Sequence, residues 1–187
     1  VDIAMNLYLR FIWVLIAAFF KPKIKDITAT QRLNFHVLPN DLDLNGHMNN
    51  GRYLTIMDLG RIDLIMRTGL MGAMIRQKNI PVLASAKMRF RLPLHPFQPY
   101  RLETQLLAWD EKWVYIEQRF VMTSGSKAGA VAAIGLIKAS LYSSTKRETV
   151  PTSDLLRIIG AEQDSPPLPE YVKAWIIAED HLKNVTK

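Results

Sequence analysis

Residues 41–53 read Asp41-Leu42-Asp43-Leu44-Asn45-Gly46-His47-Met48-Asn49-Asn50-Gly51-Arg52-Tyr53 and stand directly before a long segment with helical periodicity. The stretch places carboxylates, an imidazole and carboxamides at a predicted helix entrance. A helix N-terminus offers backbone N–H groups that have no partner within the helix, and a nearby carboxylate can act as a base. A base and donors for a developing oxyanion are what attack on a carbonyl requires. The stretch therefore predicts either a catalytic site or a well-capped turn.

The segment that follows, from Gly51 to about Leu70, is predicted to be a helix buried on most of its sides. Its polar residues form a narrow stripe, and apolar residues cover the rest of its surface. Gly60 interrupts the middle of this helix at a cost of about 1 kcal/mol relative to alanine. We expect a neighbouring element to approach the helix closely at that glycine.

Beyond this helix the hydrophobic period changes to two, which is typical of strands. Residues 82–92 are predicted as a half-buried strand with a basic outer face, and residues 100–109 and 113–122 as a hairpin. Residues 130–142 carry an almost continuous small-apolar run, as in a central strand covered on both faces. With a short strand before the motif, at 31–38, this order indicates an α+β domain whose antiparallel sheet curls around one long helix. The open edge of such a sheet favours pairing in a dimer.

The composition bounds the classes of function. The chain has 187 residues, of which 49% are hydrophobic and 22% are charged, as in one globular domain. The absence of cysteine excludes disulfides, thiolate nucleophiles and cysteine metal sites, and it fits a cytoplasmic protein. No histidine spacing indicates a metal site. The net charge of +7 implies attraction to a polyanion, but the basic residues are dispersed and no nucleic-acid reader motif is present. We therefore expect no nucleic-acid partner.

The chain is predicted to have three parts. Residues 1–25 form a hydrophobic and basic helical segment, residues 26–150 the main domain, and residues 151–187 a helical tail. The uninterrupted apolar run of the first part covers roughly 15 Å as a helix, about half a bilayer core. Its aromatic residues and trailing lysines suit a helix at the surface of the inner membrane, in contact through residues 5–25. The alternative is a helix packed on its own domain or on a dimer partner.

The motif Asp-x-Asp-x-Asn-x-His-x-Asn-Asn-x-x-Tyr, opening a helix before a run of antiparallel strands, resembles the hot-dog-fold acyl thioesterases of the 4-hydroxybenzoyl-CoA thioesterase type. Over almost the whole chain the sequence is most similar to proteins like thioesterase superfamily member 6. The resemblance implies a sheet wrapped around a central helix, a dimer or dimer of dimers, and active sites at the dimer interface. It also implies an acyl-CoA or acyl-ACP substrate, with no cofactor and no metal.

The resemblance also implies roles for individual residues. Asp43 matches the family's catalytic carboxylate, acting as nucleophile or as base, and Asn45 and His47 match additional active-site residues. The backbone N–H groups of Asn50 and Gly51, at the helix entrance, are predicted to polarise the thioester oxygen.

Each role has a structural alternative. The motif carboxylates can form turns, the asparagines can cap the helix, and His47 can be structural. Asp41 is predicted to be structural. Asp58 is a second candidate carboxylate, although Arg61 three residues later favours an ion pair.

Lys87, Arg89 and Arg91 alternate on one face of the predicted strand. They are candidates for binding the phosphates of CoA or the acidic surface of an acyl carrier protein, and the alternative is a solvated strand face. The sequence thus predicts an acyl-thioester hydrolase. The competing hypothesis is a membrane-peripheral protein that binds acyl thioesters, or serves as a scaffold, without turnover.

Overall fold

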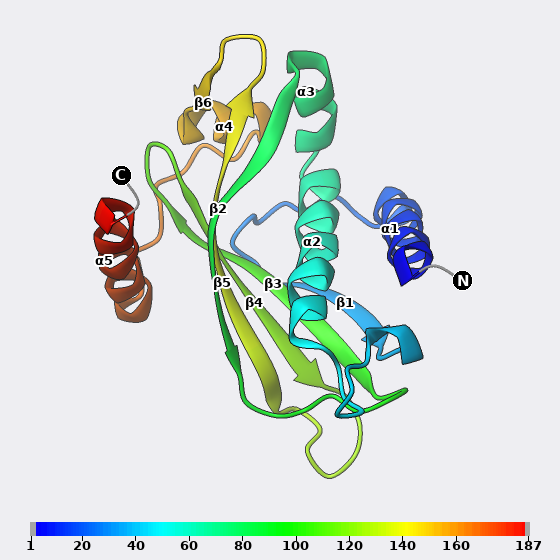
Figure 1. The fold of residues 1–187 in the computed structure, drawn as a ribbon. Coiled ribbons are helices and arrows are strands. Elements are labelled where there is room, and N and C mark those ends of the chain that lie inside the picture. The colour runs from blue at the N-terminus through cyan, green and yellow to red at the C-terminus, as the bar shows by residue number, and fades with distance from the viewer. Residues whose placement is uncertain (1–2, 186–187) are drawn as a thin grey trace.

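The helix α2 (Asn50–Arg67) lies against one face of a curved antiparallel sheet in the computed structural model, which describes residues 3–185, with side chains from residue 7 onward (Figure 1). The strands are β1 (Gln31–His36), β2 (Asn79–Phe90), β3 (Pro99–Trp109), β4 (Val114–Met122), β5 (Val131–Ser143) and β6 (Glu148–Val150). Their order in the sheet is β1-β3-β4-β5-β2, with β6 paired to β5. The predicted α+β hot-dog architecture, a sheet wrapped around one long helix, is confirmed.

The other helices surround this unit. They are α1 (Ile3–Phe20), α3 (Leu70–Gln77), α4 (Thr152–Ile159) and α5 (Glu170–Val185). Helix α1 packs beside α2, and α5 lies on the opposite side of the sheet (Figure 1). The sequence did not predict α3, which begins after Gly69 turns the chain with φ = +82°. The predicted long helix ends at about Leu70, where α3 begins.

Gly60 brings α2 close to the sheet, as predicted from its place in the helix. A Cβ atom at this position would meet the side chains of Leu102 and Thr104 on β3 and of Gln118 on β4. Gln118 is itself buried and donates 2.9 Å hydrogen bonds to the Met57 carbonyl and the Thr104 hydroxyl. The glycine therefore makes room for a polar link between helix and sheet.

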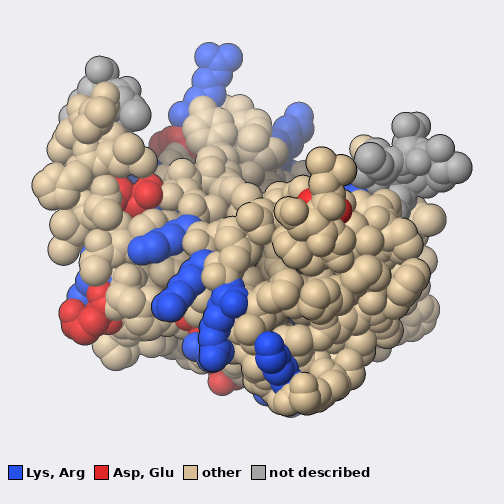
Figure 2. Space-filling model, turned by 60° about the horizontal axis from the view of Figure 1, so that its bottom comes forward, with Lys and Arg blue, Asp and Glu red and all other residues tan. Residues whose placement is uncertain are grey.

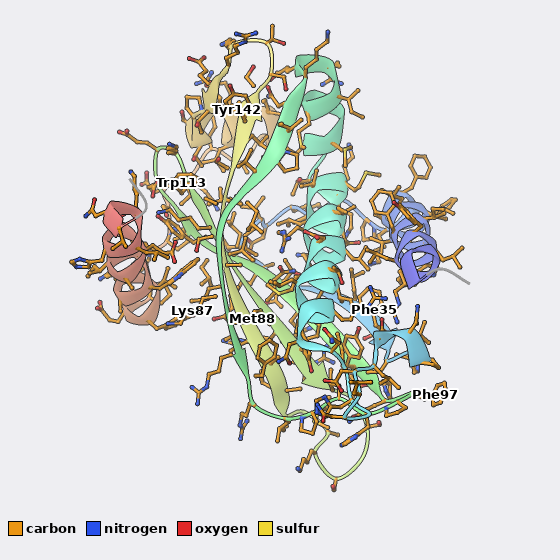
Figure 3. All side chains as sticks on the ribbon, viewed as in Figure 1. Phe35, Lys87, Met88, Phe97, Trp113 and Tyr142 are labelled. Carbon is orange, nitrogen blue, oxygen red and sulfur yellow. The ribbon has the colours of Figure 1, made fainter. Side chains whose placement is uncertain are left out.

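Strand β2 differs from its prediction in burial. Residues 82–92 were expected to be half-buried, yet most residues of β2 are exposed. The physical reason is that β2 is an edge strand with only β5 as neighbour, and the register shifts between Leu83 and Ser85. Past this bulge the predicted alternation holds, since Met88 faces α2 and Lys87 lies on the other side (Figure 3).

Helix α1 packs on the domain with one side and is exposed on the other. Val14 and Ala18 are buried, Arg10 binds Asp41, and Lys21 lies 3.1 Å from Asp63. Six large apolar residues on the remaining surface are 50–79% exposed, namely Leu9, Ile12, Trp13, Ile16, Phe19 and Phe20. Packing on its own domain thus accounts for one face of α1, and contact with a membrane stays a prediction for the other.

The predicted division at residues 25 and 150 also stays a prediction. Val14 from the first part and Leu156 from the last belong to the same hydrophobic core as the central residues. Both terminal parts therefore pack on the main domain.

Candidate functional site

The loop before α2 is fixed by its own backbone hydrogen bonds. The Asp43 N–H donates to the His47 carbonyl at 2.9 Å, and the Gly46 N–H donates back to the Asp43 carbonyl at 3.1 Å. Gly46 has φ = +73°, which a glycine adopts without strain. The Met48 N–H donates to the Leu94 carbonyl at 2.9 Å, which joins the loop to the segment after β2. These bonds hold residues 43–47 as a tight turn.

Asp41 is a buried structural anchor, as predicted. Only 1% of its side chain is accessible, and its two carboxylate oxygens accept hydrogen bonds from Arg10 at 2.6 and 3.0 Å. It also accepts the Leu38 N–H at 2.9 Å, and Arg52 lies 3.5 Å away. Arg10 is the partner that sequence reasoning missed, although a single arginine within an apolar run is a signal for such a buried pair.

Asp43 has different surroundings. One carboxylate oxygen accepts the Asn45 N–H at 2.9 Å, and the other lies 3.4 Å from Nδ1 of His47. Its side chain is 20% accessible, so the carboxylate can reach a ligand. Burial, together with the charge of Asp43, raises the pKa of Tyr53 to about 12. The structure therefore brings Asp43, His47 and the Asn45 backbone together beside the first turn of α2.

At the entrance of α2, one backbone N–H group is hydrogen-bonded and another has no acceptor among the described residues. Asn49 is the N-cap, and its side-chain oxygen accepts the Gly51 N–H at 2.8 Å. The Asn50 N–H has no acceptor among the described residues. The Asn50 N–H is therefore open to a ligand, whereas the Gly51 N–H is engaged by the cap.

The surface of the site is open in a single chain. The Asn45 side chain is exposed and Leu44 is fully exposed, which is unusual for a leucine. Residues 41–53 line neither the apolar cavity of about 570 Å³ along α2 nor the cavity beside β6 and α4.

Asp58 and Arg61 form the predicted ion pair on α2. Arg61 also donates to Oε1 of Gln118 at 2.9 Å. Burial lowers the pKa of Arg61, and the charge of Asp58 counters this shift. The same helix also carries a buried carboxylate, Asp63, held by Lys21 and Arg67, which sequence reasoning missed because it lies within apolar neighbours.

The basic residues lie on β2 and on the segment that follows it. Lys87, Arg89 and Arg91 are all exposed, and Lys87 projects from the side of β2 that faces away from α2 (Figure 3). Figure 2 shows lysine and arginine side chains gathered in a row on this side of the molecule. Across residues 3–185, no cluster of three or more acidic or histidine side chains could hold a metal ion, and no helix is long and apolar enough to cross a membrane.

The fold and the loop together define a class of protein. The model of the thioesterase-like superfamily matches residues 37–176, and the chain belongs to this family. It is 32% identical over 173 residues to Protein THEM6 of Xenopus laevis, covering 92% of this chain and 80% of that protein.

Solved structures agree on the fold. The probable thioesterase YbaW of Escherichia coli aligns with a TM-score of 0.63 at 20% identity, over 70% of this chain and 96% of that one. The gentisyl-coenzyme A thioesterase BH1999 aligns with a TM-score of 0.59 at 21% identity, over 68% of this chain and 99% of that one. Family membership supports thioester hydrolysis as the general class of activity.

Proposed function

We propose that this chain hydrolyses the thioester of an acyl-CoA or acyl-ACP substrate at the loop before α2. The observation that carries the proposal is the meeting of an accessible carboxylate, Asp43, with the open Asn50 N–H at a helix N-terminus. The carboxylate supplies the base or nucleophile, and the N–H supplies the oxyanion donor. Family membership supports this assignment.

The chemistry follows from these positions. As a base, Asp43 takes a proton from water, whose oxygen forms a bond to the thioester carbon. As a nucleophile, Asp43 forms that bond itself, and water then cleaves the resulting anhydride. In both routes the carbonyl oxygen gains negative charge beside Asn50, with Gly51 as the second donor, and the positive end of the helix dipole stabilises it. The C–S bond then breaks, and the thiolate takes up a proton.

His47 and Asn45 have positioning roles in this proposal. His47 orients the Asp43 carboxylate from 3.4 Å, and the Asn45 N–H holds its other oxygen. The exposed Asn45 side chain is available to the water or the thioester. No step calls for a metal or a cofactor.

The homodimer is part of the proposal, because the loop before α2 is exposed in one chain. Strand β2 is an unpaired edge, and its Ile80 and Phe90 are 50% and 43% exposed. Pairing of β2 with a second copy would cover this edge and extend the sheet. In such a dimer the basic residues Lys87, Arg89 and Arg91 serve to bind the phosphates of CoA.

Peripheral contact with an anionic membrane is proposed for α1. Its outer face is apolar, and Lys21, Lys23 and Lys25 follow its end. An apolar helix face beside a basic cluster suits the interface of an anionic bilayer. This observation favours the second candidate function, a membrane-peripheral protein that binds acyl thioesters without turnover. A cytoplasmic location at the inner membrane fits either function.

A substrate panel separates the two candidates. The purified chain is offered acyl-CoA and acyl-ACP thioesters of several lengths, and released thiol and free acid are both measured. The proposal expects both products with at least one carrier, and the binding function expects saturable binding with neither product. Failure of every thioester to bind would contradict both.

A further inference from the structure

Arg10 of α1 reaches the base of the loop that carries the proposed chemistry. Its two terminal nitrogens donate to the two carboxylate oxygens of Asp41 at 3.0 and 2.6 Å, and one of them also donates to the His36 carbonyl at 3.0 Å. Only 10% of the Arg10 side chain and 1% of the Asp41 side chain are accessible. A guanidinium that binds both oxygens of a buried carboxylate fixes the orientation of that carboxylate as well as balancing its charge. Helix α1 therefore holds Asp41 in one position.

Asp41 in turn closes the loop before α2. Its carbonyl accepts the N–H of Asn49, the N-cap of α2, at 2.8 Å. Within the loop, the Asp43 N–H donates to the His47 carbonyl at 2.9 Å. The loop is thus a narrow hairpin whose base is the pair Asp41 and Asn49. Asp43 follows the first residue of this base and Asn50 follows the second, so their relative position depends on how the base is held.

A second ion pair ties α1 to the domain at a distance from this loop. Lys21, directly after α1, lies 3.1 Å from the carboxylate of Asp63, whose side chain is also 1% accessible. Asp63 is roughly 20 Å from Asn50 along α2, at 1.5 Å per residue. Two equally buried carboxylates thus hold the same helix, and only one of them belongs to the loop. This contrast separates a residue that holds α1 from a residue that holds the site.

We propose that Arg10 is a positioning residue for hydrolysis. Through Asp41 it fixes the base of the loop, and with it the placement of the Asp43 carboxylate relative to the open N–H of Asn50. The inference rests on the proposed function, because it gives Arg10 a role in that reaction. Arg10 lies before residues 37–176, which the family model matches. Helix α1 thereby belongs to the working site, in addition to offering its outer face to a membrane.

Arg10→Met removes the charge and keeps most of the length of the side chain. With the thioester that the wild type turns over fastest, kcat is expected to fall by about tenfold to a hundredfold, while KM stays within about threefold. Misplacement of reacting groups by about 1 Å is sufficient for such a loss, and the contacts that bind the substrate remain. The kinetics are measured at a temperature at which circular dichroism shows the variant to be folded. An unchanged kcat in folded Arg10→Met would overturn the proposal.

Asp41→Asn and Asp63→Asn form a matched pair of variants, because each breaks one of the two ion pairs of α1 at an equally buried carboxylate. Asp41→Asn is expected to lower kcat as Arg10→Met does, whereas Asp63→Asn keeps kcat within a few-fold of the wild type. A similar loss of kcat in Asp63→Asn would show that Arg10 only holds α1 on the domain, and the positioning role would be wrong.

The double variant, Arg10→Met with Asp41→Asn, separates stability from positioning. It leaves neither partner as an unpaired buried charge, so its denaturation midpoint is expected to lie above that of Asp41→Asn alone. Its kcat is expected to stay as low as in either single variant and to fall no further, since both changes act through one contact. Recovery of kcat together with the midpoint would mean that only stability was affected, and would overturn the proposal.

Amide hydrogen exchange followed by NMR tests the loop without relying on turnover. The N–H groups of Asp43 and Asn49 are bonded within the loop, and both are expected to exchange at least tenfold faster in Arg10→Met than in the wild type or in Asp63→Asn. Faster exchange in a protein that hydrolyses no thioester would support the hold of Arg10 on the loop and refute the proposed function. Hydrolysis with neither exchange nor kcat altered in Arg10→Met would refute the role of Arg10 alone.

Discussion

Asp41 and Asp43 stand two residues apart in one loop, and their surroundings give them opposite properties. Asp41 is buried and held by Arg10, whereas Asp43 stays accessible beside His47. Their order in the motif does not decide this difference. It follows from an arginine 31 residues earlier in the chain, which the fold places against Asp41.

Asp41→Asn is expected to lower the free energy of unfolding by about 3 kcal/mol, because it leaves the Arg10 guanidinium buried without a counter-charge. Urea denaturation followed by circular dichroism measures the loss. Asp154→Asn is the matched control, since its pair with Arg157 is largely solvent-accessible and contributes at most about 1 kcal/mol. Equal effects of the two substitutions would refute the anchoring role of Asp41.

Gly60→Ala tests the close approach of α2 to the sheet. The added methyl group meets Leu102, Thr104 and Gln118, so we expect a loss of about 2 kcal/mol in unfolding free energy. Gly72→Ala on α3 provides the comparison, because its new methyl would meet only the flexible end of Arg76. That control should be neutral or stabilising by up to about 1 kcal/mol. A stabilising Gly60→Ala would contradict the packing described for this position.

At the scale of elements, the periodicity of the sequence predicted α2, the β3–β4 hairpin and β5 within a few residues. These elements have one fully buried face, so their side-chain pattern reports their structure. The burial of strand β2 and the existence of helix α3 escaped this reasoning. The burial of β2 depends on how many neighbours it has, and α3 is separated from α2 by a turn at Gly69 rather than by a change of pattern.

The apolar outer face of α1 can be tested for binding to a membrane. A double substitution, Trp13→Glu with Phe19→Glu, is expected to weaken binding to phosphatidylcholine vesicles containing phosphatidylglycerol at least tenfold, because each buried aromatic side chain contributes about 1.5–3 kcal/mol. Co-sedimentation measures the binding, which should also fall with added salt. Ile177→Glu on the exposed surface of α5 should bind as the wild type does. Unweakened binding by the double variant would exclude α1 as the contact.

At the scale of the whole molecule, the sequence resemblance implied a hot-dog fold, and the sheet wrapped around α2 confirms it. Asp43 accepts the Asn45 N–H and lies 3.4 Å from Nδ1 of His47, and the catalytic roles of these residues stay a prediction. The sequence pattern offered the asparagines as caps, but it could not decide that the cap engages the Gly51 N–H, because a cap and an oxyanion donor require the same residues at the same spacing. It also could not predict the cavity, whose walls come from both ends of the chain.

The exposed edge of β2 is the proposed surface for dimerisation. Ile80→Lys places a charge on this edge and should convert a dimer into monomers, since an inward charge opposes strand pairing. Light scattering after size-exclusion chromatography gives the mass. Ile177→Lys, on a surface outside the proposed interface, should leave the mass unchanged. A dimer that persists in Ile80→Lys would place the interface on another surface.

The rate of acyl-CoA hydrolysis by Asp43→Asn is the most direct measurement of the central claim. Loss of the carboxylate should reduce kcat by about a hundredfold to ten-thousandfold, the contribution of a general base or more. The denaturation midpoint should stay near that of the wild type, because Asp43 is accessible and carries no buried ion pair. Asp58→Asn, which alters the other candidate carboxylate, should retain turnover within a few-fold. Undiminished hydrolysis by a folded Asp43→Asn protein would contradict the proposed site.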